Sequence, residues 1–113
     1  MERGLRFGVI TIQNVPWPTL VERWQYLDEL GFDSAWVADH FTNHRERAEP
    51  WLECWTLLSA LATYTGQIRI GTMVTNITFQ NPAVLARQAL TVDHVSGGRL
   101  ELGIGAGRRA ITK

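Results

Sequence analysis

Four short apolar runs alternate with three longer amphipathic segments along this chain, and the connections between them are short. We expect strands at residues 5–12, 32–38, 68–76 and 99–104, and helices at residues 18–30, 50–65 and 81–95. Strands that alternate with helices of this length are typical of right-handed crossovers and a parallel sheet. The sequence therefore predicts an α/β fold with the element order βαβαβαβ.

Each expected helix has boundary signals and one apolar face. Proline is favoured in the first turn of a helix and glycine just after its end. The expected start and stop residues are Pro18 and Gly31, Pro50 and Gly66, and Asn81-Pro82 and Ser96-Gly97-Gly98. Apolar residues recur at helical spacing: Leu20, Trp24, Leu27 and Leu30 on the first helix, Leu57, Leu58, Leu61 and Ala62 on the second, and Val84, Leu85, Ala89 and Val92 on the third.

The composition and net charge indicate which kinds of binding partner and which cellular compartment to expect. The chain has 113 residues without a linker-like segment, so we expect one domain over residues 1–113. Its formal net charge is zero, which gives no basic surface for nucleic acid or an anionic membrane. No apolar run reaches the length of a membrane span. The single cysteine, Cys54, is expected to be a buried apolar residue, and a lone cysteine favours the reducing cytoplasm.

The carboxyl ends of the expected strands carry the residues best suited to chemistry, because parallel sheets place ligands there. Asp39-His40 follows the second strand, and histidine is the side chain best suited to proton transfer near neutral pH. An aspartate that caps a loop beside a surface histidine is an equally good interpretation of this pair. Gly103-Ile104-Gly105-Ala106-Gly107 lacks the spacing of a dinucleotide motif. No His or Cys spacing predicts a metal site.

Four segments together resemble the N-terminal half of the bacterial luciferase-like monooxygenase superfamily, whose members use a flavin or a deazaflavin. They are residues 30–40 (LGFDSAWVADH), 69–75 (RIGTMVT), 81–86 (NPAVLA) and 93–107 (DHVSGGRLELGIGAG). The resemblance covers nearly the whole chain up to Gly107. It implies the N-terminal half of a TIM (β/α)8 barrel, with the cofactor ring across the carboxyl ends of the strands.

The resemblance also implies roles for particular residues. The pair Asp39-His40 would lie beside the ring as cofactor-binding and catalytic residues, with His40 assisting binding or proton transfer. The bond between Met73 and Val74 would be a non-prolyl cis peptide in a strand bulge that supports one face of the ring. Asn76 would contact the polar edge of the ring. The remaining residues expected to bind the cofactor are Thr72, Gly105 and Gly107.

These similarities predict an oxidoreductase or monooxygenase that acts on a small organic substrate, with coenzyme F-420 ranked slightly above FMN. A complete barrel of this kind needs about 250 residues, so we expect a truncated chain whose residues 108–113 form an atypical tail. Some family members place an acid near the position of Arg108, and none is carried over here. The alternative is a non-catalytic remnant, or a half-barrel that forms homo-oligomers through open strand edges.

Overall fold

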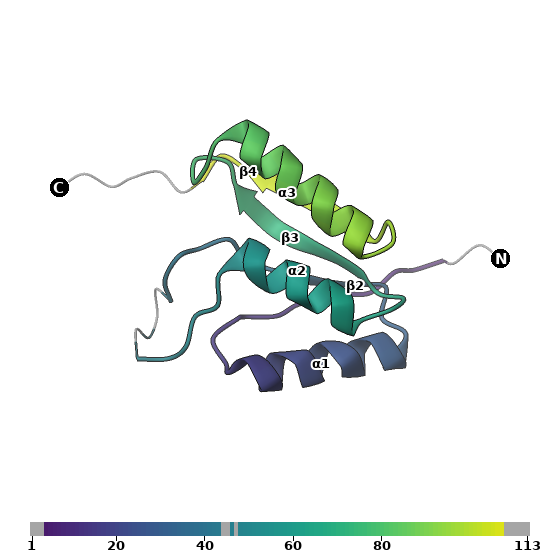
Figure 1. Ribbon diagram of the computed structural model, residues 1–113. Coiled ribbons are helices and arrows are strands. Elements are labelled where there is room, and N and C mark those ends of the chain that lie inside the picture. The colour runs from purple at the N-terminus through teal and green to yellow at the C-terminus, as the bar shows by residue number, and fades with distance from the viewer. Residues whose placement is uncertain (1–3, 44–45, 47, 108–113) are drawn as a thin grey trace.

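The computed structural model describes residues 4–43, 46 and 48–107, and Figure 1 shows its elements. In chain order these are β1 (Gly8–Ile10), α1 (Trp17–Leu30), β2 (Ser34–Val37), α2 (Cys54–Tyr64), β3 (Arg69–Asn76), α3 (Pro82–Val95) and β4 (Leu100–Gly105). The strands form one parallel sheet in the order β1-β2-β3-β4, so each strand pairs with its neighbours in sequence. The expected α/β class and βαβαβαβ order are confirmed. Residues 108–113, expected to be an atypical tail, lie outside the described residues.

The hydrophobic core lies between the sheet and the helices on one of its faces (Figure 1). Strand residues that point toward the helices are fully buried, whereas their neighbours in sequence point to the opposite face. Each large side chain buried here stabilises the fold by about 1.5–3 kcal/mol. The fully buried apolar residues are Leu20 and Trp24 of α1, Ala35 and Val37 of β2, Cys54, Leu58 and Leu61 of α2, and Ile70 of β3.

Most of the expected helix signals are confirmed. Gly31 ends α1 in the left-handed region, at φ 86°, where a residue with a Cβ atom would be strained. At the start of α3, the side chain of Asn81 accepts a hydrogen bond from the backbone N–H of Ala83 at 2.7 Å, and Pro82 is in the first turn. None of the helices in the described part of the chain is long and apolar enough to cross a membrane.

The expected start of the second helix at Pro50 is wrong. Helix α2 begins at Cys54, because Glu53 caps it: its carboxylate accepts hydrogen bonds from the backbone N–H groups of Trp55 at 3.0 Å and Thr56 at 2.9 Å. The residues before Glu53 instead bond to other segments, since the N–H of Leu52 donates to the backbone oxygen of Gln13. Glutamate is not among the usual N-cap residues, so the sequence pattern did not point to this cap.

The first strand is shorter and more exposed than expected. It pairs over Gly8–Ile10 rather than residues 5–12, and Ile10 is exposed. Its apolar residues were expected to be buried, but β1 has a neighbouring strand on one side only. Two residues of the expected helix faces, Leu30 and Val84, are also exposed.

At the amino end of the sheet, two charged residues hold the loops in place. The carboxylate of Asp28 accepts hydrogen bonds from the backbone N–H groups of three consecutive residues, at 2.7, 3.0 and 2.8 Å: Gly66, Gln67 and Ile68. The guanidinium of Arg99 donates to the backbone oxygens of Ala62 and Thr65, which satisfies carbonyl groups at the C-terminus of α2. This end of the sheet is therefore organised for stability.

Candidate functional site

The carboxyl ends of β2 and β3 are joined through Asp39. Its Oδ2 accepts a hydrogen bond from the backbone N–H of Asn76 at 3.0 Å, and the side chain is only 5% exposed. Parallel strands place their carboxyl ends on one edge, and this bond fixes how the segment after β2 meets the end of β3. The Asp39 carboxylate thus has a structural contact with the end of β3, and its expected role beside a cofactor stays a prediction.

Burial and neighbouring charges give Asp39 an unusual electrostatic environment. Its pKa is raised above the ordinary value, chiefly because burial disfavours the charged carboxylate. The hydrogen bond from Asn76 opposes this shift, the negative charge of Glu53 adds to it, and His40 opposes it. A carboxyl whose pKa is raised near the end of a strand is a group that a ligand or a proton transfer can influence.

His40 lies next to Asp39 with an exposed side chain. Its backbone oxygen accepts a hydrogen bond from the indole Nε1 of Trp51 at 2.7 Å, and the two rings lie 6.5 Å apart at an angle of 46°. The segment before α2 therefore holds the backbone of His40 while its imidazole stays accessible. This arrangement suits a residue that meets a bound molecule.

The third strand contains the expected irregularity. The peptide bond between Met73 and Val74 is cis, as the family resemblance implied, and the pairing of β3 with β4 shifts register between Thr72 and Thr75. The side chains of Met73 and Val74 are 43% and 46% exposed. Both therefore present apolar surface to solvent, and Val74 lies beside Gly105 of β4 on the face of the sheet that the helices leave open.

Thr72, expected to contact the cofactor, points the other way. Its side chain is fully buried, and its hydroxyl donates to the backbone oxygen of Gly103 at 2.9 Å. The hydroxyl of Thr75, also fully buried, donates to that of Thr72 at 2.8 Å. These two hydroxyls connect the residues on either side of the bulge to β4. In this structure the Thr72 side chain supports the strand and does not line the open face.

Glycines in β4 and just after it make room for the side chains of β3. A Cβ atom added at Gly105 would lie 2.6 Å from Cγ2 of Val74. One added at Gly107, which has φ 86°, would lie 2.6 Å from Oδ1 of Asn76. Both distances are too short for real contacts. Glycine at these positions therefore leaves a shallow surface next to Val74 that a larger residue would obstruct.

Asn76 is held in a turn that orients its amide. Its Oδ1 accepts hydrogen bonds from the backbone N–H of Thr78 at 3.0 Å and from its hydroxyl at 2.6 Å. Among the described residues, no acceptor is found for its Nδ2 group. The turn thus leaves a hydrogen-bond donor at the rim of the open face.

Two structurally important residues were not among the expected site residues. Gln13 is fully buried and bonds to both backbone groups of Ala38, the residue before Asp39. Thr75 secures the bulge as described above. In the sequence, Gln13 is only a polar residue that follows the expected first strand. A buried position for Gln13 is not visible in the hydrophobic pattern, because the residues around it show no strict alternation.

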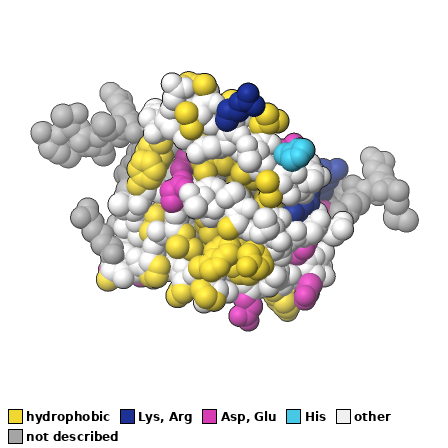
Figure 2. Space-filling model, viewed as in Figure 1, with side chains coloured by type: hydrophobic (Ala, Val, Ile, Leu, Met, Phe, Trp, Pro, Cys, Tyr) yellow, Lys and Arg dark blue, Asp and Glu magenta, His cyan; other side chains and the backbone are white. Residues whose placement is uncertain are grey.

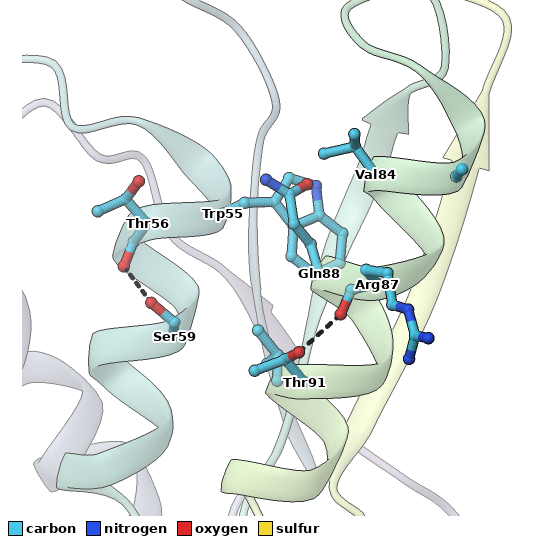
Figure 3. A pocket seen from close by; sticks show the side chains of 9 residues that line it. Trp55, Thr56, Ser59, Val84, Arg87, Gln88 and Thr91 are labelled. Atoms are coloured by element: carbon cyan, nitrogen blue, oxygen red, sulfur yellow. Dashed lines mark hydrogen bonds between the residues drawn. The ribbon is translucent and has the colours of Figure 1, made fainter.

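A separate hollow of about 590 Å³ lies between α2 and α3, on the helical side of the sheet (Figure 3). Trp55 lies at its base, only 3% exposed, and its Nε1 has no hydrogen-bond partner among the described residues. The space-filling view shows this helical side, where hydrophobic side chains also gather over α1 and α2 (Figure 2). There the ring of Trp17 packs edge-on against Tyr64, with centroids 5.7 Å apart. These helical surfaces lie on the opposite side of the sheet from Val74.

The residues on the open face fit a planar heterocycle with one polar edge. Met73 and Val74 offer an apolar surface, and the glycines of β4 leave space beside it. Asp39, His40 and Asn76 lie along the carboxyl edge as polar groups. Sites for ring-shaped cofactors commonly combine a mostly apolar surface with a few polar groups that fix orientation.

Comparison with known proteins places this geometry in a family. Residues 5–113 match the family model of the luciferase-like monooxygenases. An F-420-dependent glucose-6-phosphate dehydrogenase from Amycolatopsis mediterranei is 42% identical over 91 residues, which cover 78% of this chain and 27% of the relative. A 5,10-methylenetetrahydromethanopterin reductase from Methanolobus tindarius is 30% identical over 106 residues, covering 94% of this chain and 30% of the relative.

Solved structures show the same fold. The coenzyme F-420-dependent tetrahydromethanopterin reductase of Methanopyrus kandleri superposes with a TM-score of 0.80 at 25% identity, over 92% of this chain and 28% of that protein. The chain therefore spans roughly a quarter to a third of the length of the relatives it matches. The four strands and three helices formed by the described residues correspond to part of a TIM-barrel enzyme of this type. The chain belongs to the luciferase-like monooxygenase family.

Proposed function

We propose that this chain carries the ring-binding part of a flavin- or deazaflavin-dependent oxidoreductase that acts on a small organic molecule. The observation that carries the proposal is the hydrogen bond between Asp39 and Asn76, which brings the polar ends of β2 and β3 together beside the exposed Met73-Val74 surface. Membership of the family supports the same reading.

Each group has a distinct part in this proposal. Met73 and Val74 would hold one face of the ring, and the Nδ2 group of Asn76 would bind its polar edge. A bound flavin or deazaflavin supplies hydride transfer, and a flavin also supplies oxygen activation. The exposed imidazole of His40 donates a hydrogen bond or moves a proton at that edge. Asp39 orients the adjacent backbone through its bond to Asn76.

The space beside β4 completes the proposed surface. Gly105 and Gly107 allow backbone and ring to approach closely, because a side chain at either position would collide with Val74 or Asn76. The hydroxyl of Thr72 is not proposed to bind the cofactor, because it already donates to the backbone oxygen of Gly103. Thr72 supports the site by holding β3 against β4.

We rank coenzyme F-420 above FMN. Two relatives with 42% and 30% identity carry names that denote an F-420-dependent dehydrogenase and a methylenetetrahydromethanopterin reductase. The Asp-His pair after β2 is also the feature on which the family resemblance favours the deazaflavin branch. A cytoplasmic location is part of the proposal, supported by the single cysteine, Cys54, which is buried and has no second cysteine to pair with.

Fluorescence titration tests this function. Purified chain is titrated with coenzyme F-420 and with FMN, and binding in the micromolar range is expected, about −8 kcal/mol, with the deazaflavin bound more tightly. Circular dichroism run in parallel establishes that the chain is folded. A folded chain that binds neither cofactor contradicts the proposal, and tighter binding of FMN reverses the ranking.

A second candidate is a self-associating half-barrel without activity of its own. It is supported by the sheet edges, since β1 and β4 are the outermost strands formed by the described residues and expose Ile10, Leu102 and Ile104. Exposed apolar edge strands favour pairing with another chain. Light scattering coupled to size-exclusion chromatography tests it. A homo-oligomer that binds no cofactor supports this candidate, and a monomer contradicts it.

A further inference from the structure

The pairing between β1 and β2 continues beyond the end of β1, but through a side chain. The last backbone contact is the N–H of Thr11, which donates to the oxygen of Trp36 at 2.9 Å. Two residues later the chain has turned toward α1. The next residue along this chain segment whose backbone groups need a partner on this side is Ala38, which directly follows β2 and precedes Asp39.

The carboxamide of Gln13 provides that partner. Its Nε2 donates to the backbone oxygen of Ala38, and its Oε1 accepts from the backbone N–H of Ala38 at 3.2 Å. A primary amide carries an acceptor oxygen and an NH2 donor on adjacent atoms, so one side chain can bond to both the N–H and the C=O of a single residue. Gln13 therefore replaces a strand residue opposite Ala38, and its side chain is fully buried while it does so.

The same residue also fixes the segment before α2. Its backbone oxygen accepts a hydrogen bond from the N–H of Leu52 at 3.2 Å, next to the cap residue Glu53. Glu53 is one of the charges that act on Asp39. Gln13 thus holds both the backbone that carries Asp39 and the segment that brings Glu53 toward it.

A continuous series of contacts then leads across the candidate site. Gln13 holds Ala38, the chain passes directly to Asp39, and Asp39 bonds to the N–H of Asn76. This series connects the ends of β1, β2 and β3. None of its polar groups is shared with the hydroxyl pair of Thr72 and Thr75, which connects β3 to β4.

We propose that Gln13 is a positioning residue for the site: its amide sets the place of Asp39 and His40 and thereby maintains the bond from Asn76 to Asp39. The effect of Gln13 on cofactor binding rests on the proposed function. The effect of Gln13 on the position of Asp39 and His40 does not depend on any ligand. Replacing Gln13 by a residue of similar length without the amide leaves both backbone groups of Ala38 without these partners. A buried backbone group without a partner is unfavourable, so the local backbone moves to regain one.

The test follows the amide proton of Asn76 by NMR as the pH is changed. In the unaltered chain this proton reports the ionisation of Asp39, to which it is hydrogen-bonded. In Gln13→Met we expect the pH-dependent displacement of the Asn76 signal to fall at least about twofold, because the hydrogen bond is populated less. The backbone signals of Asp39 and His40 move as well.

A second group of amide signals distinguishes a local shift of Asp39 and His40 from a general loss of structure. The amide protons of Gly66, Gln67 and Ile68 report Asp28 in the same way at the opposite end of the sheet. They should titrate unchanged in Gln13→Met. Gln25→Met, the same substitution at an exposed position of α1, should change neither group of signals.

Gln13→Glu provides a second measurement if Gln13→Met does not fold. A protonated glutamate carries an O–H donor and a C=O acceptor in the places of the amide, whereas the ionised form has no donor. We expect the Asp39 and His40 signals of Gln13→Glu to approach their unaltered positions as the pH falls through the carboxyl range. Signals that do not respond to protonation of Glu overturn the proposal.

The proposal is overturned if Gln13→Met folds and the amide signal of Asn76 shifts with pH as much as it does in the unaltered chain. If cofactor binds, its affinity in Gln13→Met should fall about tenfold, equivalent to about 1.4 kcal/mol. If the unaltered chain binds no cofactor while the Asn76 titration responds to Gln13→Met, the proposed function fails and the positioning role stands.

Discussion

The carboxylate of Asp39 and the backbone N–H of Asn76 form a hydrogen bond of 3.0 Å that joins the carboxyl ends of β2 and β3. Asp39 comes from a segment 37 residues earlier in the chain. The acceptor is a largely buried carboxylate, while the donor is a backbone N–H that every substitution at Asn76 except proline retains. The geometry of the candidate site therefore depends on the side chain of Asp39 more than on that of Asn76.

Asp39→Ala should destabilise the chain by about 1–3 kcal/mol, because it leaves a partly buried N–H without its acceptor. Asp39→Asn keeps an acceptor oxygen and removes a charge whose burial is unfavourable, so it should differ from the unaltered chain by less than about 1 kcal/mol. Urea unfolding near neutral pH measures both. Equal losses in the two variants would show that the hydrogen bond is not what Asp39 contributes.

The pH dependence of Asp39 follows from its raised pKa. Because burial makes the folded chain hold this proton more tightly than the unfolded chain, the contribution of Asp39 to stability decreases as the pH rises from the ordinary value, 3.8, through the raised folded value. The advantage of Asp39→Asn should therefore grow over that interval. A stability difference between the two chains that is constant with pH would contradict the assigned direction.

Asp28 should behave in the opposite way. Burial raises its pKa, but the backbone hydrogen bonds from Gly66, Ile68 and Gln67, together with Arg99, outweigh burial and leave the pKa below the ordinary value of 3.8. Its contribution to stability is present above that value and is lost as the pH falls through the lowered folded value. Asp28→Asn should therefore be destabilising near neutral pH and become nearly neutral in acid. Urea unfolding at a series of pH values checks this, and a penalty that persists in acid contradicts it.

Two buried tryptophans offer a matched comparison. The Nε1 of Trp24 donates to the hydroxyl of Thr11 at 2.9 Å, whereas that of Trp55 has no partner among the described residues. Substitution by phenylalanine removes a similar volume at both positions. Trp24→Phe should be more destabilising than Trp55→Phe by about 1 kcal/mol, because only the former loses a hydrogen bond. The hydroxyl of Thr11 still donates to the backbone oxygen of Trp36 at 3.3 Å after the substitution. Thermal or urea unfolding of both variants measures the difference, and the reverse order would contradict it.

Elements with a strong periodic pattern were predictable from the sequence, whereas contacts between distant segments were not. The faces of α1 and α2 and the cap at Asn81 followed from local spacing and residue type. The cap at Glu53 was not predictable, because the position of Glu53 depends on a contact between distant segments. The N–H of Leu52, next to Glu53, donates to the backbone oxygen of Gln13.

The candidate site shows the same division. The residues at the strand ends were foreseen because a parallel sheet gathers them, and the cis bond at Met73 was foreseen from the resemblance alone. The inward direction of Thr72 was not foreseen, although Thr72 follows Ile70 by two residues in regular register and therefore shares its core-facing side. The register shift comes only after Thr72, and it is Thr75 whose inward direction depends on the shift. A strict alternation along β3 cannot predict a bulge.

Gly105→Ala tests the space beside Val74. The added methyl would lie 2.6 Å from Cγ2 of Val74, so Val74 must move and the surface for a ring is altered. We expect cofactor affinity to fall at least about tenfold, or about 1.4 kcal/mol. Gly66→Ala is the control, because the nearest atom to its added methyl is 3.8 Å away. Equal affinity in both variants, measured by fluorescence titration, would remove Gly105 from the site.

The central claim is that a flavin or deazaflavin ring lies on the open face at the ends of β2, β3 and β4. The most direct measurement is an NMR titration of isotope-labelled chain with coenzyme F-420 and, separately, with FMN. The account predicts that backbone signals of Asp39, His40, residues 73–76 and residues 105–107 shift, while those lining the hollow between α2 and α3 do not. A folded chain with no shifts, or with shifts only between α2 and α3, would contradict it.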